Sequence, residues 1–112
     1  MSDLMQSLAI SSSGMRAQAT RLRHVAENIA NVDTPGYQRK TVPFQTERAP
    51  DSDATYVSTG RVRLDRSELQ LIYDPSHPLA DETGHYDGSY VNLTVESADS
   101  REAQRSYEAN LK

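Results

Sequence analysis

The chain has 112 residues and no cysteine, its formal net charge is −4, and 36% of its residues are hydrophobic, with one Phe and no Trp. A chain of this length forms at most one domain, and its mean hydropathy of −0.73 leaves it a small core, so we expect partners to contribute to its stability. The lack of cysteine excludes disulfides and thiolate metal sites.

Charge and hydropathy also bear on location and partners. No run approaches the roughly 18 apolar residues of a membrane span, and the first residues lack the basic start and apolar centre of a cleaved signal, which alone would predict a cytoplasmic protein. Residues 1–48 have a charge balance of +2 and residues 49–112 one of −6. This asymmetry favours head-to-tail contacts, while a net acidic chain without a basic tract argues against nucleic acid as the main partner.

Residues 4–29 follow the heptad pattern of a coiled-coil helix. Two heptad positions three residues apart carry an apolar seam, which we expect to mediate assembly and which consists of Met5, Leu8, Met15, Ala19, Leu22, Ala26 and Ile29. The alternative is an ordinary amphipathic helix packed on its own domain. We favour the intermolecular interpretation because the C-terminal half offers too little apolar surface to cover the stripe.

The end of this helix carries a signature, Asn28-Ile-Ala-Asn-Val-Asp-Thr-Pro-Gly-Tyr37. This signature predicts that the helix stops here and that the chain turns. We expect Asn31 to adopt a left-handed cap and Pro35-Gly36 to form the centre of a type II turn. The two asparagines have side chains that can bond freed backbone carbonyls or a neighbouring subunit. The signature residues are Asn28, Ala30, Asn31, Thr34, Pro35, Gly36 and Tyr37.

Beyond Tyr37 the period approaches two, which predicts a β-rich insert over residues 37–91. Short strands are expected around residues 42–44, 62–64 and 69–73, with residues 65–68 as the turn of a hairpin between the last two. Residues 47–55 are expected to form a mobile loop, and an irregular stretch is expected from residue 74 to residue 88.

Asn92 is a candidate N-cap for a final helix over residues 92–112. The best apolar stripe of this helix is only half apolar and runs through Leu93, Ser97, Ser100, Gln104, Tyr107 and Leu111. The helix has no capping residue, Gly or Pro at Lys112, so we expect it to be cut short there. The complete prediction is an α+β fold, in which helices at residues 1–36 and 92–112 form a coiled-coil layer and flank the β-rich insert.

No constellation in the sequence supports catalysis or a cofactor. His77 and His85 lie near acidic residues, but neither histidine pair has i, i+4 spacing, so no metal site is expected. His24 is expected on the surface or at an interface. The chain lacks a Gly-x-Ser-x-Gly elbow and a cysteine nucleophile, and its carboxylates lack the apolar surroundings that raise the pKa of a general acid.

The signature resembles that of the flagellar axial family, whose rod and hook proteins carry a similar Asn-Ile-Ala-Asn-x-x-Thr-Pro-Gly-Tyr motif after their N-terminal helix. Three further blocks are similar to the proximal-rod proteins of that family: residues 11–23, residues 73–80 and the Arg105-Ser-Tyr-Glu-Ala-Asn110 segment. The resemblance implies C-terminal interaction residues at Arg105, Ser106, Tyr107, Asn110 and Leu111. The chain departs from these proteins at Tyr90, Ser97 and Ser100, and by ending at Lys112 where they continue as helix.

The resemblance implies a structural rod subunit that polymerises helically, transmits torque and has no cofactor. Its implied partners are the rod proteins FlgB, FlgF and FlgG, the protein FliE and the flagellar export apparatus, with no nucleic acid and no membrane span. Its implied location is the periplasmic rod, reached by flagellar type III export without a cleaved signal peptide. Two alternatives stay open at this point: a soluble helical adaptor, and a cell-wall hydrolase that would need a catalytic carboxylate.

Overall fold

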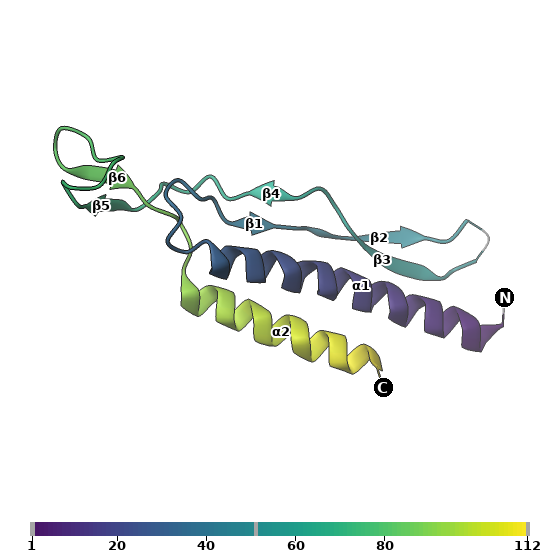
Figure 1. Cartoon of the computed structure of the whole chain (residues 1–112). Coiled ribbons are helices and arrows are strands. Elements are labelled where there is room, and N and C mark those ends of the chain that lie inside the picture. The colour runs from purple at the N-terminus through teal and green to yellow at the C-terminus, as the bar shows by residue number, and fades with distance from the viewer. Residues whose placement is uncertain (1, 51, 112) are drawn as a thin grey trace.

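The computed structural model describes residues 2–50 and 52–111. Two long helices lie side by side, a long hairpin covers part of the first helix, and a small two-stranded lobe projects beyond the helices at one end (Figure 1). The molecule is elongated, with extents of 66 × 26 × 16 Å. These two helices with a small antiparallel insert between them confirm the α+β prediction.

Helix α1 (Asp3–Ala30) is capped at both ends by side chains. The Ser2 hydroxyl accepts the Met5 N–H at 3.2 Å, and Asp3 lies in the first turn, where a negative charge is favoured. At the other end, the Asn31 side chain donates to the Glu27 carbonyl at 2.8 Å. The Asn31 backbone has φ −110°, so the prediction of a left-handed cap was wrong: the side-chain bond satisfies a free carbonyl without that conformation.

The turn after α1 has the expected chemistry. Gly36 has φ +76°, and the Tyr37 N–H bonds the Thr34 carbonyl at 3.1 Å across the Pro35-Gly36 pair. A positive φ at the third residue and a proline at the second are the features of a type II turn, which glycine adopts without strain. The chain therefore reverses direction at the position where the sequence predicted it.

The first four strands form one long, two-part antiparallel hairpin rather than the arrangement that the sequence suggested. Strand β1 (Lys40–Thr41) pairs with β4 (Arg63–Leu64), and β2 (Phe44–Arg48) pairs with β3 (Thr55–Thr59). The Gly60 N–H bonds the Pro43 carbonyl at 2.9 Å between the two parts. In the expected mobile loop at residues 47–55, residues 47, 48 and 55 thus belong to the two paired strands, and the described residues between them form the tip of the hairpin. Asp51 lies outside the described residues.

Residues 65–68 do not connect paired strands, so the hairpin predicted there was wrong. Asp65 instead accepts the backbone N–H and the hydroxyl of Ser67, at 2.8 and 2.6 Å, in a local turn that leads out of the long hairpin. The next strand, β5 (Leu71–Tyr73), pairs with β6 (His85–Asp87), which lies in the stretch expected to be irregular. We call residues 71–87 the distal lobe.

Helix α2 (Leu93–Leu111) begins where the sequence predicted, since the Asn92 side chain accepts the Thr94 N–H at 2.9 Å. It runs antiparallel to α1, with Glu96 beside Asn28 and Asn110 beside Gly14. The predicted half-apolar stripe does not face α1: Leu93 and Leu111 are exposed, whereas Glu96 and Ala103 are buried. Lys112, where the helix was expected to be cut short, lies outside the described residues.

The core is small and largely polar. Among the described residues its buried hydrophobic side chains are Ala17, Val25, Ala54 and Ala103, and two of the buried polar ones, Asn28 and Glu96, have no exposed area. Small side chains allow the two helices to approach closely, and polar contacts replace the large apolar contacts of an ordinary helix pair. No helix among the described residues combines the length and apolarity needed to cross a bilayer.

Candidate functional site

A polar cluster with a buried centre joins the end of α1 to the long hairpin and to α2. We call it the Asn28 junction. Its members are Asn28, Tyr37, Arg39, Lys40, Glu96 and Asp99. They come from the end of α1, the start of the long hairpin and the first turns of α2, so the junction fixes the positions of these three elements.

Asn28 is the centre of this junction and uses its whole side chain. Its Oδ1 accepts the Lys40 N–H at 2.9 Å and the Tyr37 hydroxyl at 2.8 Å. Its Nδ2 donates to the Lys40 carbonyl at 3.0 Å and to both Glu96 oxygens at 3.3 Å. The amide thus pairs with the backbone of Lys40 as a neighbouring strand would, and fully satisfies a side chain with no exposed area.

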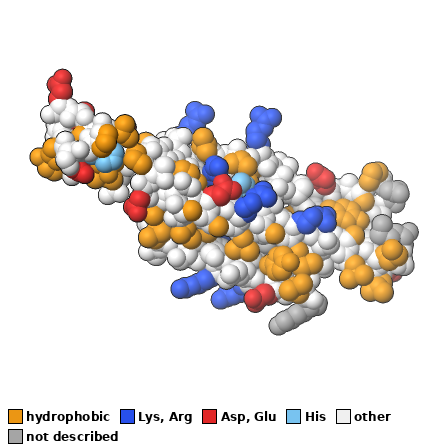
Figure 2. All heavy atoms as spheres, in the orientation of Figure 1, with side chains coloured by type: hydrophobic (Ala, Val, Ile, Leu, Met, Phe, Trp, Pro, Cys, Tyr) orange, Lys and Arg blue, Asp and Glu red, His pale blue; other side chains and the backbone are white. Residues whose placement is uncertain are grey.

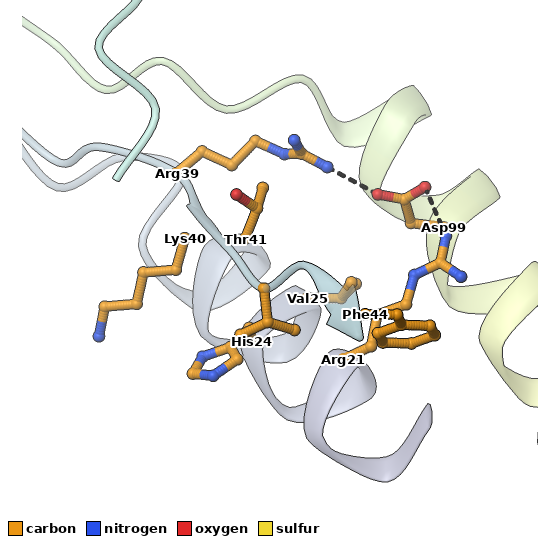
Figure 3. A pocket seen from close by; sticks show the side chains of 9 residues that line it. Arg21, His24, Val25, Arg39, Lys40, Thr41, Phe44 and Asp99 are labelled. Carbon is orange, nitrogen blue, oxygen red and sulfur yellow. Dashed lines mark hydrogen bonds and ion pairs between the residues drawn. The ribbon is translucent and has the colours of Figure 1, made fainter. Parts of the chain in front are cut away.

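Glu96 is the buried charge of the junction, and Arg39 neutralises it. The Arg39 Nε donates to Glu96 Oε1, and its Nη2 donates to Asp99 Oδ2 at 2.6 Å. Asp99 also accepts from Arg21 Nη2 at 3.1 Å, which ties the pair back to α1 (Figure 3). Burial acts to lower the pKa of Arg39, but the hydrogen bond to Glu96 and the nearby carboxylates of Glu96, Asp99 and Asp65 raise it overall, so this cation stays charged.

A second ion pair lies at the edge of the junction. Lys40 Nζ donates to Glu27 Oε2 at 2.8 Å, and this hydrogen bond lowers the pKa of Glu27 and raises the pKa of Lys40. Burial raises the pKa of Tyr37, whose hydroxyl therefore remains protonated and able to donate to Asn28. The Lys40–Glu27 pair and the Tyr37–Asn28 hydrogen bond hold the hairpin against the last turns of α1.

The remaining signature residues shape the exit rather than the junction. The Thr34 hydroxyl donates to Asn31 Oδ1 at 3.0 Å, and the Gly36 N–H reaches the Asp87 and Gly88 carbonyls, each at 3.2 Å. Gly36 therefore joins the exit turn to the base of the distal lobe. Ala30 and Pro35 are exposed.

The seam residues lie on the side of α1 opposite its buried residues Ala17, His24, Val25 and Asn28. Met5, Leu8 and Ile29 are 62%, 61% and 38% exposed. Ala19 and Ala26 are also exposed, and Met15 and Leu22 are half-buried. Neither α2 nor the hairpin covers the seam, which is left as an apolar stripe on the surface of the chain.

The C-terminal interaction residues are spread around α2. Asn110 lies against Gly14, where an added Cβ would be 3.0 Å from Asn110 Nδ2. Ser106 and Tyr107 are half-buried, whereas Arg105 is exposed and Leu111 is 62% exposed. Asn110 therefore lies at the contact between α2 and α1.

The histidines differ from expectation in one respect. His24 is only 7% exposed, so the expectation of a surface position was wrong, and an interface position stays a prediction. His77 stacks on Tyr86 with ring centroids 3.9 Å apart, and His85 packs edge-on against Tyr73. The described residues contain no group of three or more His, Asp or Glu side chains that could hold a metal ion.

Arg39, Glu96 and Asp99 were not identified from the sequence, although they hold the helices together. The signal was present: Glu96, Asp99, Ala103 and Asn110 recur at helical spacing, as a stripe in which three of the four residues are polar. Pattern analysis assigns such a stripe to solvent because charged residues are rarely buried. Only the three-dimensional pairing with Arg39 reveals that the stripe faces α1.

Comparison with known proteins identifies the family. Residues 8–38 match the family model described as "Flagella basal body rod protein". The chain is similar to the "Flagellar basal-body rod protein FlgC" of Agrobacterium fabrum, with 46% identity over 91% of this chain and 78% of the relative. It is similar to the FlgC protein of Aquifex aeolicus, with 37% identity over 100% of this chain and 87% of the relative. It is also similar to the FlgC protein of Salmonella typhimurium, with 33% identity over 91% of this chain and 81% of the relative. The chain belongs to the FlgC family of flagellar basal-body rod proteins, which are structural components of the rod and not enzymes.

Proposed function

We propose that this rod subunit assembles through the seam of α1, which receives a helix from a neighbouring subunit in a helically ordered layer. The observation that supports this most directly is the exposure of Met5 and Leu8, at 62% and 61%, on a heptad stripe opposite the face that the chain itself buries. Burying such side chains is favourable by about 1.5–3 kcal/mol each. The free subunit leaves most of the Met5 and Leu8 side-chain area in water, so assembly has a driving force that folding alone does not use.

The proposal assigns three roles along the chain. Residues 1–36 form the first assembly helix and its exit, residues 37–91 form an insert outside the helical layer, and residues 92–112 form the second assembly helix. The residues assigned to contact neighbours in the second helix are Arg105, Ser106, Tyr107, Asn110 and Leu111. The layer surrounds the export channel and transmits torque because many helix contacts share the load.

The specific partners follow from membership of the family rather than from contacts in this chain. We infer that the neighbours are FlgB, FlgF, FlgG and FliE, and that the subunit passes through the flagellar export apparatus without a cleaved signal. The rod that it joins lies in the periplasm.

The test uses Leu8→Ser in a strain that lacks its own copy of the gene. We expect swimming and complete rods in isolated basal bodies to be lost, because a large apolar contact buried between subunits is worth about 2–5 kcal/mol. The purified variant should unfold in urea within about 0.5 kcal/mol of the unmodified chain, since Leu8 is 61% exposed in the free subunit. Arg23→Ser, at an exposed position of α1 outside the seam, is the matched control and should assemble normally. Complete rods in the Leu8→Ser strain and also in a separate Ile29→Ser strain would contradict the proposal.

A further inference from the structure

Two of the strand ladders have one edge that the chain closes with its own polar groups. On β1, the N–H and carbonyl of Lys40 bond the Asn28 side chain. On β6, the His85 N–H donates to the Asp81 carboxylate at 3.1 Å, and the His85 carbonyl accepts the Asp81 N–H at 2.8 Å. The edges on the other side of these ladders belong to β4 and β5, and an open edge is a template for pairing with another strand.

The outer edge of β4 directs its backbone groups away from its own ladder. Lys40 and Leu64 are cross-strand partners, and Lys40 uses its N–H and carbonyl for Asn28, so this pair is not hydrogen-bonded within the ladder. Leu64 must therefore direct its own N–H and carbonyl outward, where neither has a partner among the described residues. This edge lies on the side of the hairpin away from α1 (Figure 1).

The outer edge of β5 is open in the same way. The Asp74 N–H bonds the Gly84 carbonyl at 2.8 Å, at the end of the ladder with β6. Because hydrogen-bonded and non-hydrogen-bonded pairs alternate along an antiparallel ladder, Tyr73 and Leu71 direct their N–H and carbonyl groups outward. These groups have no partner in the described part of the chain. The Leu71 and Tyr73 side chains are also exposed, at 62% and 66%.

The apolar side chains of the two edges match in one antiparallel register. When Leu64 lies opposite Leu71 of a second copy, Val62 lies opposite Tyr73 of that copy, because side chains alternate between the two faces of a strand. Val62 and Leu64 are 42% and 51% exposed in the free chain. This register therefore pairs the exposed apolar side chains of both edges on one face.

The charged side chains on the other face select the antiparallel orientation. Arg61 and Arg63 are exposed and make no ion pair or hydrogen bond among the described residues. In this register Asp74 of the second copy lies opposite Arg61 and diagonal to Arg63. Asp74 uses Oδ1 for the N–H and hydroxyl of Ser76, at 3.2 and 2.7 Å, so its Oδ2 can accept from an arginine. A parallel pairing of the same edges would instead set Asp65 beside Asp74.

Net charge favours pairing between these two unlike edges. Residues 61–66 contain three arginines and one aspartate, a net charge of +2, whereas the distal lobe has four acidic residues and no Lys or Arg, a net charge of −4. Figure 2 shows Lys and Arg side chains projecting from the side of the molecule where β4 lies, and acidic side chains on the lobe. Pairing β4 with β4, or β5 with β5, would bring like charges together. Strand β2 suits the lobe less well, because its Arg48 already pairs with Asp53 at 2.5 Å.

We propose that β5 of one copy adds to β4 of a second copy as an antiparallel strand, with Leu71 opposite Leu64 and Asp74 beside Arg61. Within one chain β4 and β5 belong to different sheets and do not pair. The two edges differ, so the contact is head-to-tail and can continue from copy to copy. This inference rests on the proposed assembly and adds to it a strand contact outside the seam.

The experiment exploits the absence of cysteine from the chain. Copies carrying Leu64→Cys and copies carrying Leu71→Cys are expressed together in a strain lacking its own gene, and the isolated basal bodies are oxidised. The control replaces Leu71→Cys by Leu79→Cys, because both residues belong to the distal lobe and both are 62% exposed. We expect disulfide-linked dimers at a yield at least about fivefold above the control, because only strands held in register bring the two sulfurs together.

A proline tests whether the contact uses the backbone. Tyr73→Pro in the Leu71→Cys copy removes an outward N–H, and proline is tolerated on an edge strand whose N–H faces solvent, so the free chain should keep its fold. The dimer yield should fall at least about fivefold, because the added strand loses a hydrogen bond to β4. Tyr73→Ala removes the same ring and keeps the N–H, and it should lower the yield about twofold or less. Equal losses with both changes would overturn strand addition.

A charge reversal tests the orientation. Arg61→Glu in the Leu64→Cys copy should lower the dimer yield at least about fivefold, because it places a carboxylate opposite Asp74. Arg66→Glu, the same reversal at an exposed arginine beyond the paired segment, should lower it about twofold or less. Equal yields with the two reversals would overturn the pairing of Arg61 with Asp74.

The cross-links also separate this inference from the proposed function. Basal bodies that contain the chain but give equal yields with the Leu71→Cys and Leu79→Cys copies would overturn the strand contact and leave the proposed function intact. The same dimer yield from either Leu64→Cys or Leu71→Cys expressed alone would show that an edge pairs with itself, which would also overturn the contact. Absence of the unmodified chain from rods would overturn the proposed function and this inference together.

Discussion

Asn28 pairs with the backbone of Lys40 through two hydrogen bonds, 2.9 Å from the Lys40 N–H to Oδ1 and 3.0 Å from Nδ2 to the Lys40 carbonyl. A side chain of helix α1 thus replaces the strand that β1 lacks on that edge. This relationship explains why the signature begins with an asparagine. An aspartate side chain has no N–H donor for the Lys40 carbonyl, and a hydrophobic side chain has neither a donor nor an acceptor. The two bonds set where the hairpin begins relative to the helix.

We expect Asn28→Ala to destabilise the chain by about 3 kcal/mol, because it leaves the N–H and carbonyl of Lys40 and the carboxylate of Glu96 short of partners. Asn28→Asp should cost more, since it places a second negative charge beside Glu96. Urea unfolding followed by far-ultraviolet circular dichroism measures both. The control is Asn31→Ala, which loses the bond to the Glu27 carbonyl and the exposed bond from the Thr34 hydroxyl, and should cost about 1 kcal/mol. Equal losses for Asn28→Ala and Asn31→Ala would contradict the central place of Asn28.

The pair formed by Arg39 and Glu96 should show strong coupling in a double-mutant cycle. Glu96 has no exposed area and the Arg39 side chain is 19% exposed, so each single change, Glu96→Leu or Arg39→Met, leaves a poorly solvated charge and should cost about 2–4 kcal/mol. The double variant should be less destabilised than the sum by about 1–3 kcal/mol.

The matched control for this cycle is the exposed pair of Arg48 and Asp53, whose side chains are 72% and 95% exposed. Removing both members there should show no measurable coupling, because solvent screens the interaction. A similar coupling energy in both cycles would mean that burial does not strengthen the Arg39–Glu96 pair.

Sequence patterns predicted the elements that depend on local chemistry. Both helices follow from their period and caps, and the turn at Gly36 follows from the backbone preferences of Pro35 and Gly36. The strand over Thr55–Thr59 was missed, although its β-branched and aromatic composition was a usable signal, because acidic and proline residues before it suggested a loop.

The packing of the helices could not be predicted in the same way. Pattern analysis ranks faces by apolarity, and on α1 that ranking selects the seam, which the isolated chain leaves exposed. The face that packs contains Asn28 and meets Glu96 and Asp99, whose burial depends on Arg39, 57 and 60 residues away from them in the sequence. Such a pairing is a property of the fold and has no local signature.

The stability of the folded chain should fall at acidic pH because Glu27 becomes protonated. Its folded pKa lies below 4.5, so the contribution of its pair with Lys40 is fully present above pH 4.5 and is lost as the pH falls through the folded pKa. Lys40 acts in the opposite range: its contribution is present below pH 10.5 and is lost as the pH rises through its raised folded pKa. We expect Glu27→Gln to give a shallower fall of the urea midpoint below pH 4.5 than the unmodified chain shows. Glu108→Gln, an exposed acid on α2, is the control; a slope unchanged by Glu27→Gln would count against the pair.

Gly14 should control how closely the end of α2 approaches α1. A Cβ at this position would lie 3.0 Å from Asn110 Nδ2, so Gly14→Leu must displace the Asn110 side chain and the last turn of α2. We expect faster amide hydrogen exchange at residues 104–111, even though leucine favours helix more than glycine does by about 1 kcal/mol. Ala19→Leu, on the exposed side of α1, should leave that exchange unchanged. Unaltered exchange in both variants would show that the close approach is unimportant.

The interface between α1 and α2 consists of small side chains, ion pairs and hydrogen bonds, with Ala17, Val25 and Ala103 as its buried apolar members. When the helices separate, the surfaces that reach water are thus mostly charged or amide groups, which water solvates well. A subunit that opens before it is incorporated exposes little new hydrophobic surface for non-specific aggregation. The polar character of this interface therefore limits the aggregation of a subunit whose helices have separated.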